Sequence, residues 1–196
     1  MRNFSDIFHG VVRWLVRPFQ KKLTPGPWID FLEANRLFKD TPFLGLLSDG
    51  FQEELRLVLA GAKYGAVGKG APSKKEEPDD AWRQIWATSR PVEVDKELAC
   101  EIVFEQYILY QVRCESFADG DPEEVSQGRW FLICERSTLL SDLQKYTIVS
   151  RTDDGSYYPG EWKHYKIVTW HHIVDVVATG EPKVRWWRAD KGSSLF

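Results

Sequence analysis

Tyr107-Ile-Leu-Tyr-Gln-Val-Arg-Cys114 is the stretch of sequence that decides the fold. It is rich in β-branched and aromatic residues, and apolar and polar side chains alternate along it, which predicts a strand over 106–117. A polar loop follows over 118–128, and 129–136 then has the character of a returning strand. If the two strands pair about residue 124, Cys114 and Cys134 lie opposite each other, where we expect two reduced thiols rather than a disulfide.

The rest of the C-terminal half has the same character. Ser137 or Thr138 is a suitable N-cap for a short helix over the leucines that follow. Residues 95–104 fit the spacing of a helix and of a strand equally well. Further strands are predicted, separated by turns that contain Gly, Pro, Asp and Ser, at 165–170, 173–178 and 183–188.

The N-terminal third is predicted to be helical. Residues 3–17 have an amphipathic pattern that ends at Pro18. Its apolar residues recur at helical spacing: Phe4, Ile7, Phe8, Val11, Val12, Leu15 and Val16. The opposite stripe is polar and mostly basic: Arg2, Asp6, His9, Arg13 and Arg17. Such a helix packs on the body, pairs with a second copy, lies on an anionic membrane or binds a partner, and packing is the commonest of these.

Two more helices complete this predicted third. One follows Pro27, and the other continues to about residue 63 after Asp49 and Gln52, whose spacing resembles a capping box. We therefore predict an α+β fold, with a helical N-terminal third followed by a largely antiparallel β-sheet and one or two short helices. The predicted organisation is a helical segment over 1–64 that packs on the body, a flexible linker over 65–80, and an antiparallel α+β body over 81–196.

Charge and hydropathy restrict the class of function. The chain of 196 residues has 26 Lys and Arg against 29 Asp and Glu, a formal net charge of −3. Nucleic-acid binders are usually strongly basic, so we expect no nucleic-acid partner. No apolar run is long enough to span a bilayer, and Arg13 and Arg17 interrupt the apolar region that a secretory signal requires. These features predict a cytoplasmic protein.

One group of residues has the composition of a catalytic site. Three of the histidines fall close to Asp175 in the sequence: His164, His171 and His172. On one extended strand His171 and His172 point to opposite faces, and His164 is too far from His172 to share an ion. His171 with Asp175 is the remaining pair for acid–base chemistry, and a small hydrolase or transferase is our second hypothesis. Because the cysteines lack CxxC spacing, we expect no metal, and we expect no cofactor.

Two features favour binding to another protein. An acidic loop contains four carboxylates with no nearby Lys or Arg: Asp119, Asp121, Glu123 and Glu124. Such a loop attracts a partner with a basic surface. Trp186 and Trp187 would face opposite sides of a strand, so one of them is a candidate binding hot spot.

The hypothesis we favour is therefore a non-catalytic protein-binding module with an acidic, Trp-containing surface. Its character suits a stoichiometric inhibitor, such as an immunity protein that neutralises a toxin. A peripheral membrane protein that binds through residues 1–22 is the third hypothesis. The sequence does not determine the oligomeric state.

Overall fold

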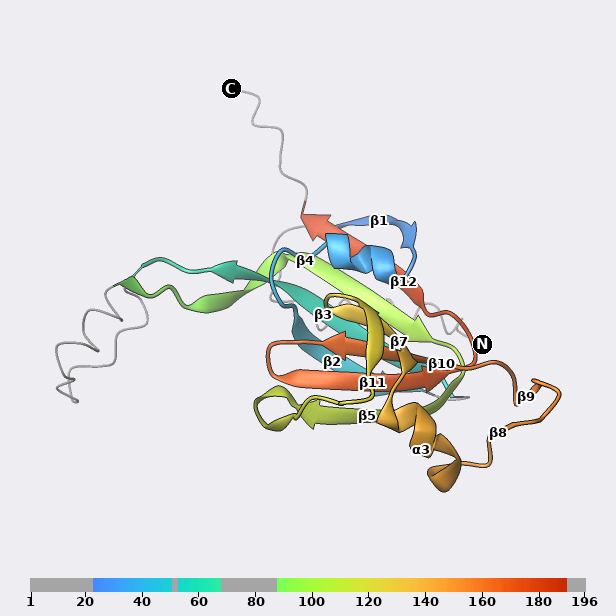
Figure 1. The fold of residues 1–196 in the computed structure, drawn as a ribbon. Helices are drawn as coiled ribbons and strands as arrows, with labels where there is room; N and C mark the ends of the chain where they lie inside the picture. Colours follow the sequence, from blue (N-terminus) through green and yellow to red (C-terminus); the bar gives the residue numbers. More distant parts are fainter. Residues whose placement is uncertain (1–22, 51–52, 68–87, 190–196) are drawn as a thin grey trace.

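The computed structural model describes residues 23–50, 53–67 and 88–189, and these form two five-stranded antiparallel sheets (Figure 1). Sheet A contains, in spatial order, β1 (Leu23–Ile29), β12 (Lys183–Ala189), β4 (Val92–Phe104), β3 (Leu55–Tyr64) and β2 (Phe43–Asp49). Sheet B contains β5 (Tyr107–Cys114), β11 (His172–Ala178), β10 (Lys163–Val168), β7 (Phe131–Arg136) and β6 (Val125–Gly128). The remaining elements are η1 (Leu32–Arg36), η2 (Glu115–Phe117), α3 (Thr138–Tyr146), β8 (Ser150–Arg151) and β9 (Tyr157–Tyr158).

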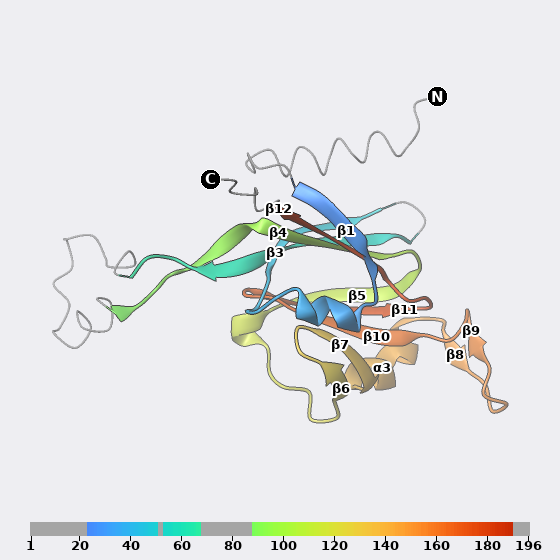
Figure 2. The ribbon, with the colours of Figure 1, turned by 90° about the horizontal axis from the view of Figure 1, so that it is seen from above.

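The main core lies between the two sheets (Figure 2). Every second residue of β3 faces inward, so Leu55, Leu57 and Leu59 are fully buried. Sheet B contributes inward-facing residues from its central strands: Tyr165, Ile167, Val174 and Val176. Phe31, just before η1, closes one end of this core, with its ring centroid 5.0 Å from that of Tyr165.

A second, smaller apolar cluster lies on the outer face of sheet B. Leu143 of α3 is fully buried there against Val177 of β11. Ser137 is the N-cap of α3, and its hydroxyl oxygen accepts a hydrogen bond from the Leu140 amide at 3.1 Å. The short capped helix predicted from sequence is confirmed. Its N-cap, Ser137, belongs to the chain of polar residues described below.

The prediction of an α+β fold with a helical N-terminal third is wrong, because the described residues are mostly β and the first of them form β1, β2 and β3. The predicted helix up to residue 63 is strand β3: Leu55 and Leu59 fit the period of a helix and that of a strand, and the pairing with β2 and β4 decides between them. Pro27 lies in β1, an edge strand, where the missing N–H of proline is tolerated. The predicted helix over 3–17 lies outside the described residues, as does most of the predicted linker over 65–80.

The strands predicted around Tyr107–Cys114 and 129–136 are confirmed as β5 and β7, but they do not pair with each other. Both β11 and β10 lie between them, so β5 pairs with β11 and β7 pairs with β10. Cys114 therefore lies opposite His172 and Cys134 opposite His164. Both cysteines are free thiols, and only Cys134 is buried. Residues 95–104, whose apolar spacing fits a helix and a strand equally well, belong to strand β4.

Gly128, at the turn from β6 into β7, has no room for a side chain. Its φ is +122°, and an added Cβ would lie 2.0 Å from the carbonyl oxygen of Phe131. We expect Gly128→Ala to lower the free energy of unfolding by ~2 kcal/mol, since both the backbone angle and the contact must change. Urea denaturation measures this, with Gly120→Ala as the control, because a Cβ at Gly120 meets nothing within 4 Å. Equal urea midpoints for the two variants would contradict the prediction.

Candidate functional site

A chain of buried polar side chains crosses the outer face of sheet B. The Ser137 hydroxyl lies 2.9 Å from Nδ1 of His164, and Nε2 of the same ring lies 3.0 Å from Oδ1 of Asp175. Each of the three residues is only 1% exposed. Three elements hold them, since Ser137 caps α3, His164 is in β10 and Asp175 is in β11.

Asp175 is the most heavily bonded carboxylate of this group. Besides His164, it accepts hydrogen bonds through Oδ2 from Nε2 of Gln111 at 3.1 Å and from Nε of Arg113 at 3.1 Å. Nη2 of Arg113 lies 3.0 Å from the same oxygen. Burial alone would raise the pKa of Asp175, but the hydrogen bond and charge of His164, the charge of Arg113 and the Gln111 bond outweigh it and lower the pKa.

One hydrogen position in this chain follows from these bonds. An ionised Asp175 is an acceptor only, so Nε2 of His164 carries the hydrogen. Nδ1 of the same ring shares a hydrogen bond with the Ser137 hydroxyl. The Ser137 oxygen in turn accepts the Leu140 amide hydrogen bond. Every member of the chain therefore has a partner on each side.

The order hydroxyl, imidazole, carboxylate is that of a serine hydrolase, but the surroundings of Ser137 are closed. Its oxygen is buried and is already used to cap α3. The amide of the next residue, Thr138, is of the kind that forms oxyanion holes, but it is bonded to the Asp121 carboxylate at 2.8 Å. In this arrangement the three residues attach α3 to sheet B, and the Ser137 hydroxyl is already engaged by His164 and by the Leu140 amide.

Asp121 and Glu124, two residues of the predicted acidic loop, face inward. Asp121 accepts hydrogen bonds from both the amide and the hydroxyl of Thr138, each at 2.8 Å. Burial would raise the pKa of Asp121, but the bonds from Thr138 and Glu123 and the charge of Lys166 lower it. Glu124 forms an ion pair with Lys166 in which both side chains are largely buried. These two acidic residues hold the loop on sheet B.

Asp119 and Glu123 of the same loop are exposed. The Glu123 carboxylate accepts a long hydrogen bond of 3.4 Å from the Ser141 hydroxyl. Phe117, in η2 directly before the loop, is 90% exposed. This is an aromatic side chain that the sequence analysis did not single out, and its exposure could be learned only from the fold.

The structure does not bring His171 and Asp175 together. His171 is exposed in the turn between β10 and β11, with its ring centroid 6.1 Å from that of Phe43. The partner of Asp175 is instead His164, which lies in the adjacent strand. Sequence reasoning considered pairs along one strand and missed this pair across the β10–β11 hairpin.

Trp186 and Trp187 are both in β12 of sheet A and are half-buried. Trp186 packs so closely over β1 that a Cβ added at Gly26 would lie 2.1 Å from its ring. Trp187 is on the other face, with the Arg185 guanidinium 5.6 Å from its ring centroid. Sheet A and the acidic loop lie on opposite sides of the molecule, so the two predicted binding features do not share one surface (Figure 2).

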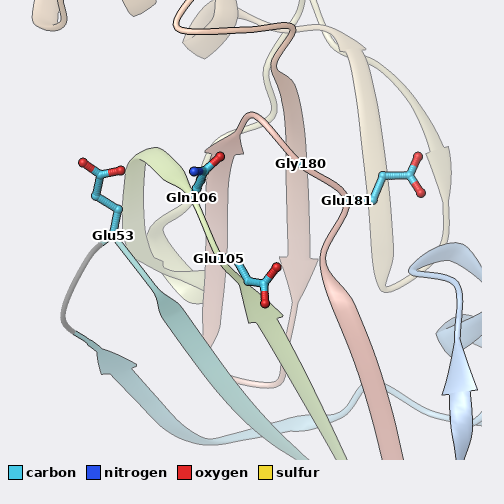
Figure 3. Close-up of a pocket in the computed structure, with 5 residues that line it drawn as sticks. All are labelled: Glu53, Glu105, Gln106, Gly180 and Glu181. Atoms are coloured by element: carbon cyan, nitrogen blue, oxygen red, sulfur yellow. The ribbon is translucent and has the colours of Figure 1, made fainter.

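An open hollow of about 620 Å³ lies at one end of the sandwich, lined by Glu53, Glu105, Gln106, Gly180 and Glu181 (Figure 3). Two of its three carboxylates have cationic partners, since Glu105 is 2.5 Å from Lys183 and Glu181 is 3.1 Å from Lys163. Within the part of the chain that the structure describes, no group of three His, Cys, Asp or Glu side chains is placed to hold a metal ion.

No family model, no curated protein and no solved structure matches the chain. Among the described residues, no helix is both long enough and apolar enough to cross a bilayer.

Proposed function

We propose that the protein is a non-catalytic protein-binding module that acts as a stoichiometric inhibitor, of the immunity-protein kind, on a partner with a basic surface. The observation that carries this proposal is Phe117, which is 90% exposed beside an acidic loop that is fixed at its base. Phe117 is the most exposed large hydrophobic side chain among the described residues, and exposed aromatic side chains are frequent binding hot spots.

The loop is pre-organised for binding. Asp121 ties it to the start of α3, and Glu124 ties it to Lys166 of β10. A loop that is already ordered loses less conformational entropy when a partner binds. The bonds of Asp121 and Glu124 therefore support a positioning role for these two residues.

The contact residues we propose are Phe117, Asp119 and Glu123. Phe117 would enter an apolar pocket of the partner, while the two carboxylates steer a basic surface toward it. Trp186 and Trp187 lie in sheet A and have no part in this surface. His171 with Asp175 is not proposed as a catalytic pair, because Asp175 is buried and bonded to other residues. A cytoplasmic location remains a prediction.

The proposal predicts two distinct effects on binding to a partner protein co-purified from the native host. Phe117→Ala is expected to weaken affinity by about 30-fold, the effect of losing a hot-spot aromatic, mainly through faster dissociation. Asp119→Lys with Glu123→Lys is expected to slow association and to remove its salt dependence. Surface plasmon resonance at two salt concentrations measures both effects.

Tyr146→Ala is the matched control, because Tyr146 is 71% exposed at the end of α3 and outside the proposed surface. It is expected to leave affinity unchanged. If Phe117→Ala binds as tightly as the Tyr146→Ala control, and the charge reversals leave association unchanged, the acidic loop is not the binding surface.

A further inference from the structure

Strand β5 has a free edge without the features that usually prevent strand addition. The two five-stranded sheets have four edge strands: β1, β2, β5 and β6. An exposed edge invites pairing with another chain, and proteins block such edges with prolines, bulges, charged side chains or very short strands. Three of the four edges are blocked in this way, and β5 is the exception.

The other three edges each carry a block. β1 contains Pro25 and Pro27, and its pairing with β12 shifts register between Pro25 and Trp28. β2 has a register shift between Leu44 and Leu46. β6 is only four residues long, and its pairing with β7 shifts register after its first residue. Because a bulge disrupts the ladder and bends the strand, none of these three offers a long regular edge.

β5, by contrast, is long and regular, and no described strand lies beyond it in sheet B (Figure 1). It has eight residues, and from Leu109 to Cys114 they pair with β11 one to one. The strand contains no Pro or Gly, and its only charged residue, Arg113, lies 3.0 Å from Asp175. Val112 is 45% exposed, and no residue of β5 is fully buried. The edge is therefore accessible and carries no uncompensated charge.

The hydrogen bonds of the ladder show which backbone groups of β5 are free. The amide of Glu115 donates to the carbonyl oxygen of His171 at 3.1 Å, so this pair is a bonded position. Bonded positions alternate in an antiparallel ladder, so Arg113 and Gln111 also bond to β11, and the residues between them turn their N–H and C=O groups outward. These outward residues are Tyr110, Val112 and Cys114. Among the described residues, no other backbone group bonds to these three.

We propose that β5 pairs with β5 of a second copy of this chain, antiparallel about a two-fold axis at Gln111, so that the two B sheets join into one continuous sheet. The outward N–H and C=O groups of each copy then bond to those of the other. In this register Tyr110 lies opposite Val112 of the second copy, and aromatic with β-branched pairs stabilise antiparallel strands. Arg113 does not lie opposite its own counterpart, so like charges are not opposed.

The character of β5 favours a second copy over the basic partner proposed for the acidic loop. Because the charge of Arg113 is neutralised within the chain, β5 has no free charge that would attract a basic surface. Steering by Asp119 and Glu123 and pairing along β5 therefore depend on different chemistry. The dimer would present one acidic loop from each copy, and its existence does not depend on the proposed function.

The first test is sedimentation equilibrium of the full chain between about 1 and about 200 µM. An interface made mainly of one strand is small, so we expect a dimer with a dissociation constant in the micromolar range. Val112→Lys is expected to weaken dimerisation at least about tenfold, because each copy brings the added charge close to the two-fold axis. Val125→Lys is the matched control, since Val125 is 38% exposed on β6, the opposite edge of the same sheet, and it should leave dimerisation unchanged.

Amide hydrogen exchange followed by NMR tests the edge without a substitution. The amides of Tyr110, Val112 and Cys114 are expected to exchange at least about tenfold more slowly well above the dissociation constant than well below it. The amides of Gln111 and Arg113 bond to β11 and should be protected at both concentrations. This alternation distinguishes strand pairing from any other contact between two copies.

Four results would overturn the proposal. The protein could remain monomeric over the whole range, or Val112→Lys could dimerise as tightly as Val125→Lys. Full protection of the outward amides in the dilute monomer would mean that the same chain covers this edge. Assembly beyond a dimer would mean that the contact is not closed by a two-fold axis. Circular dichroism of both variants verifies that the sheets are intact.

Discussion

Asp175→Ala is expected to lower the free energy of unfolding by ~3–5 kcal/mol, the range measured when one partner of a buried charge pair is removed. The Asp175 side chain is 1% exposed, and its loss leaves three groups without their acceptor: His164, Arg113 and Gln111. The chain from His164 to Ser137 is also disturbed, so the docking of α3 on sheet B weakens. Chemical denaturation followed by circular dichroism measures the loss.

Asp142→Ala is the control for removing a carboxylate, because Asp142 pairs with Lys145 on the exposed side of α3. Surface pairs of this kind contribute at most ~1 kcal/mol. Asp175→Asn is the second comparison, since it preserves the shape and one acceptor oxygen while removing the charge, and it should fall between the two. Similar urea midpoints for Asp175→Ala and Asp142→Ala would contradict a stabilising role for the buried chain.

The same carboxylate makes stability depend on pH, and the sign follows from its lowered pKa. A group whose pKa is lower in the folded state stabilises the fold above its unfolded pKa, which is ~3.9 for aspartate. That contribution is lost as the pH falls from this value through the lower folded pKa. Stability of the unmodified protein should therefore decline over this acidic window, and Asp175→Asn should show a shallower decline.

From residue 106 onward the elements could be predicted largely from sequence because their local signals are strong. Ser137 before three leucines predicted a capped helix, and α3 begins at the next residue. The predicted strands from 106 onward are present because β-branched and aromatic residues dominate them. Their partners could not be predicted, since β5 and β7 lie apart in sheet B and each pairs with a strand from further along the chain.

The N-terminal prediction failed where two periods overlap. Leu55, Val58 and Leu59 fit a helical face, whereas Leu55, Leu57 and Leu59 fit one face of a strand. The strand is selected only by the pairing of β3 with β2 and β4, and such pairing is a property of the tertiary structure. Sequence likewise identified the acidic loop, but it could not show that Asp121 and Glu124 face inward while Asp119 and Glu123 remain exposed.

Asn35→Ala is expected to lower the free energy of unfolding by ~3–4 kcal/mol, because one side chain of η1 fixes the turn between β6 and β7. Its Oδ1 accepts hydrogen bonds from three successive backbone amides, at 3.2, 2.7 and 3.1 Å: Arg129, Trp130 and Phe131. Its Nδ2 donates to the carbonyl oxygens of Phe131 at 2.8 Å and Leu32 at 3.0 Å. Alanine removes all five bonds, and amides left partly buried without partners cost ~1 kcal/mol or more each.

Asn35→Asp separates the two halves of this arrangement. The carboxylate preserves the acceptor for the three amides but loses both donors, and it places a negative oxygen against the two carbonyls. We therefore expect a loss intermediate between the unmodified protein and Asn35→Ala, measured by urea denaturation. Because Phe131 is fully buried beside Phe31, loosening of this turn should reach the main core, and hydrogen exchange of the β7 amides should accelerate in Asn35→Ala. Unchanged exchange in β7 would mean that the packing of Phe131, and not Asn35, fixes the turn.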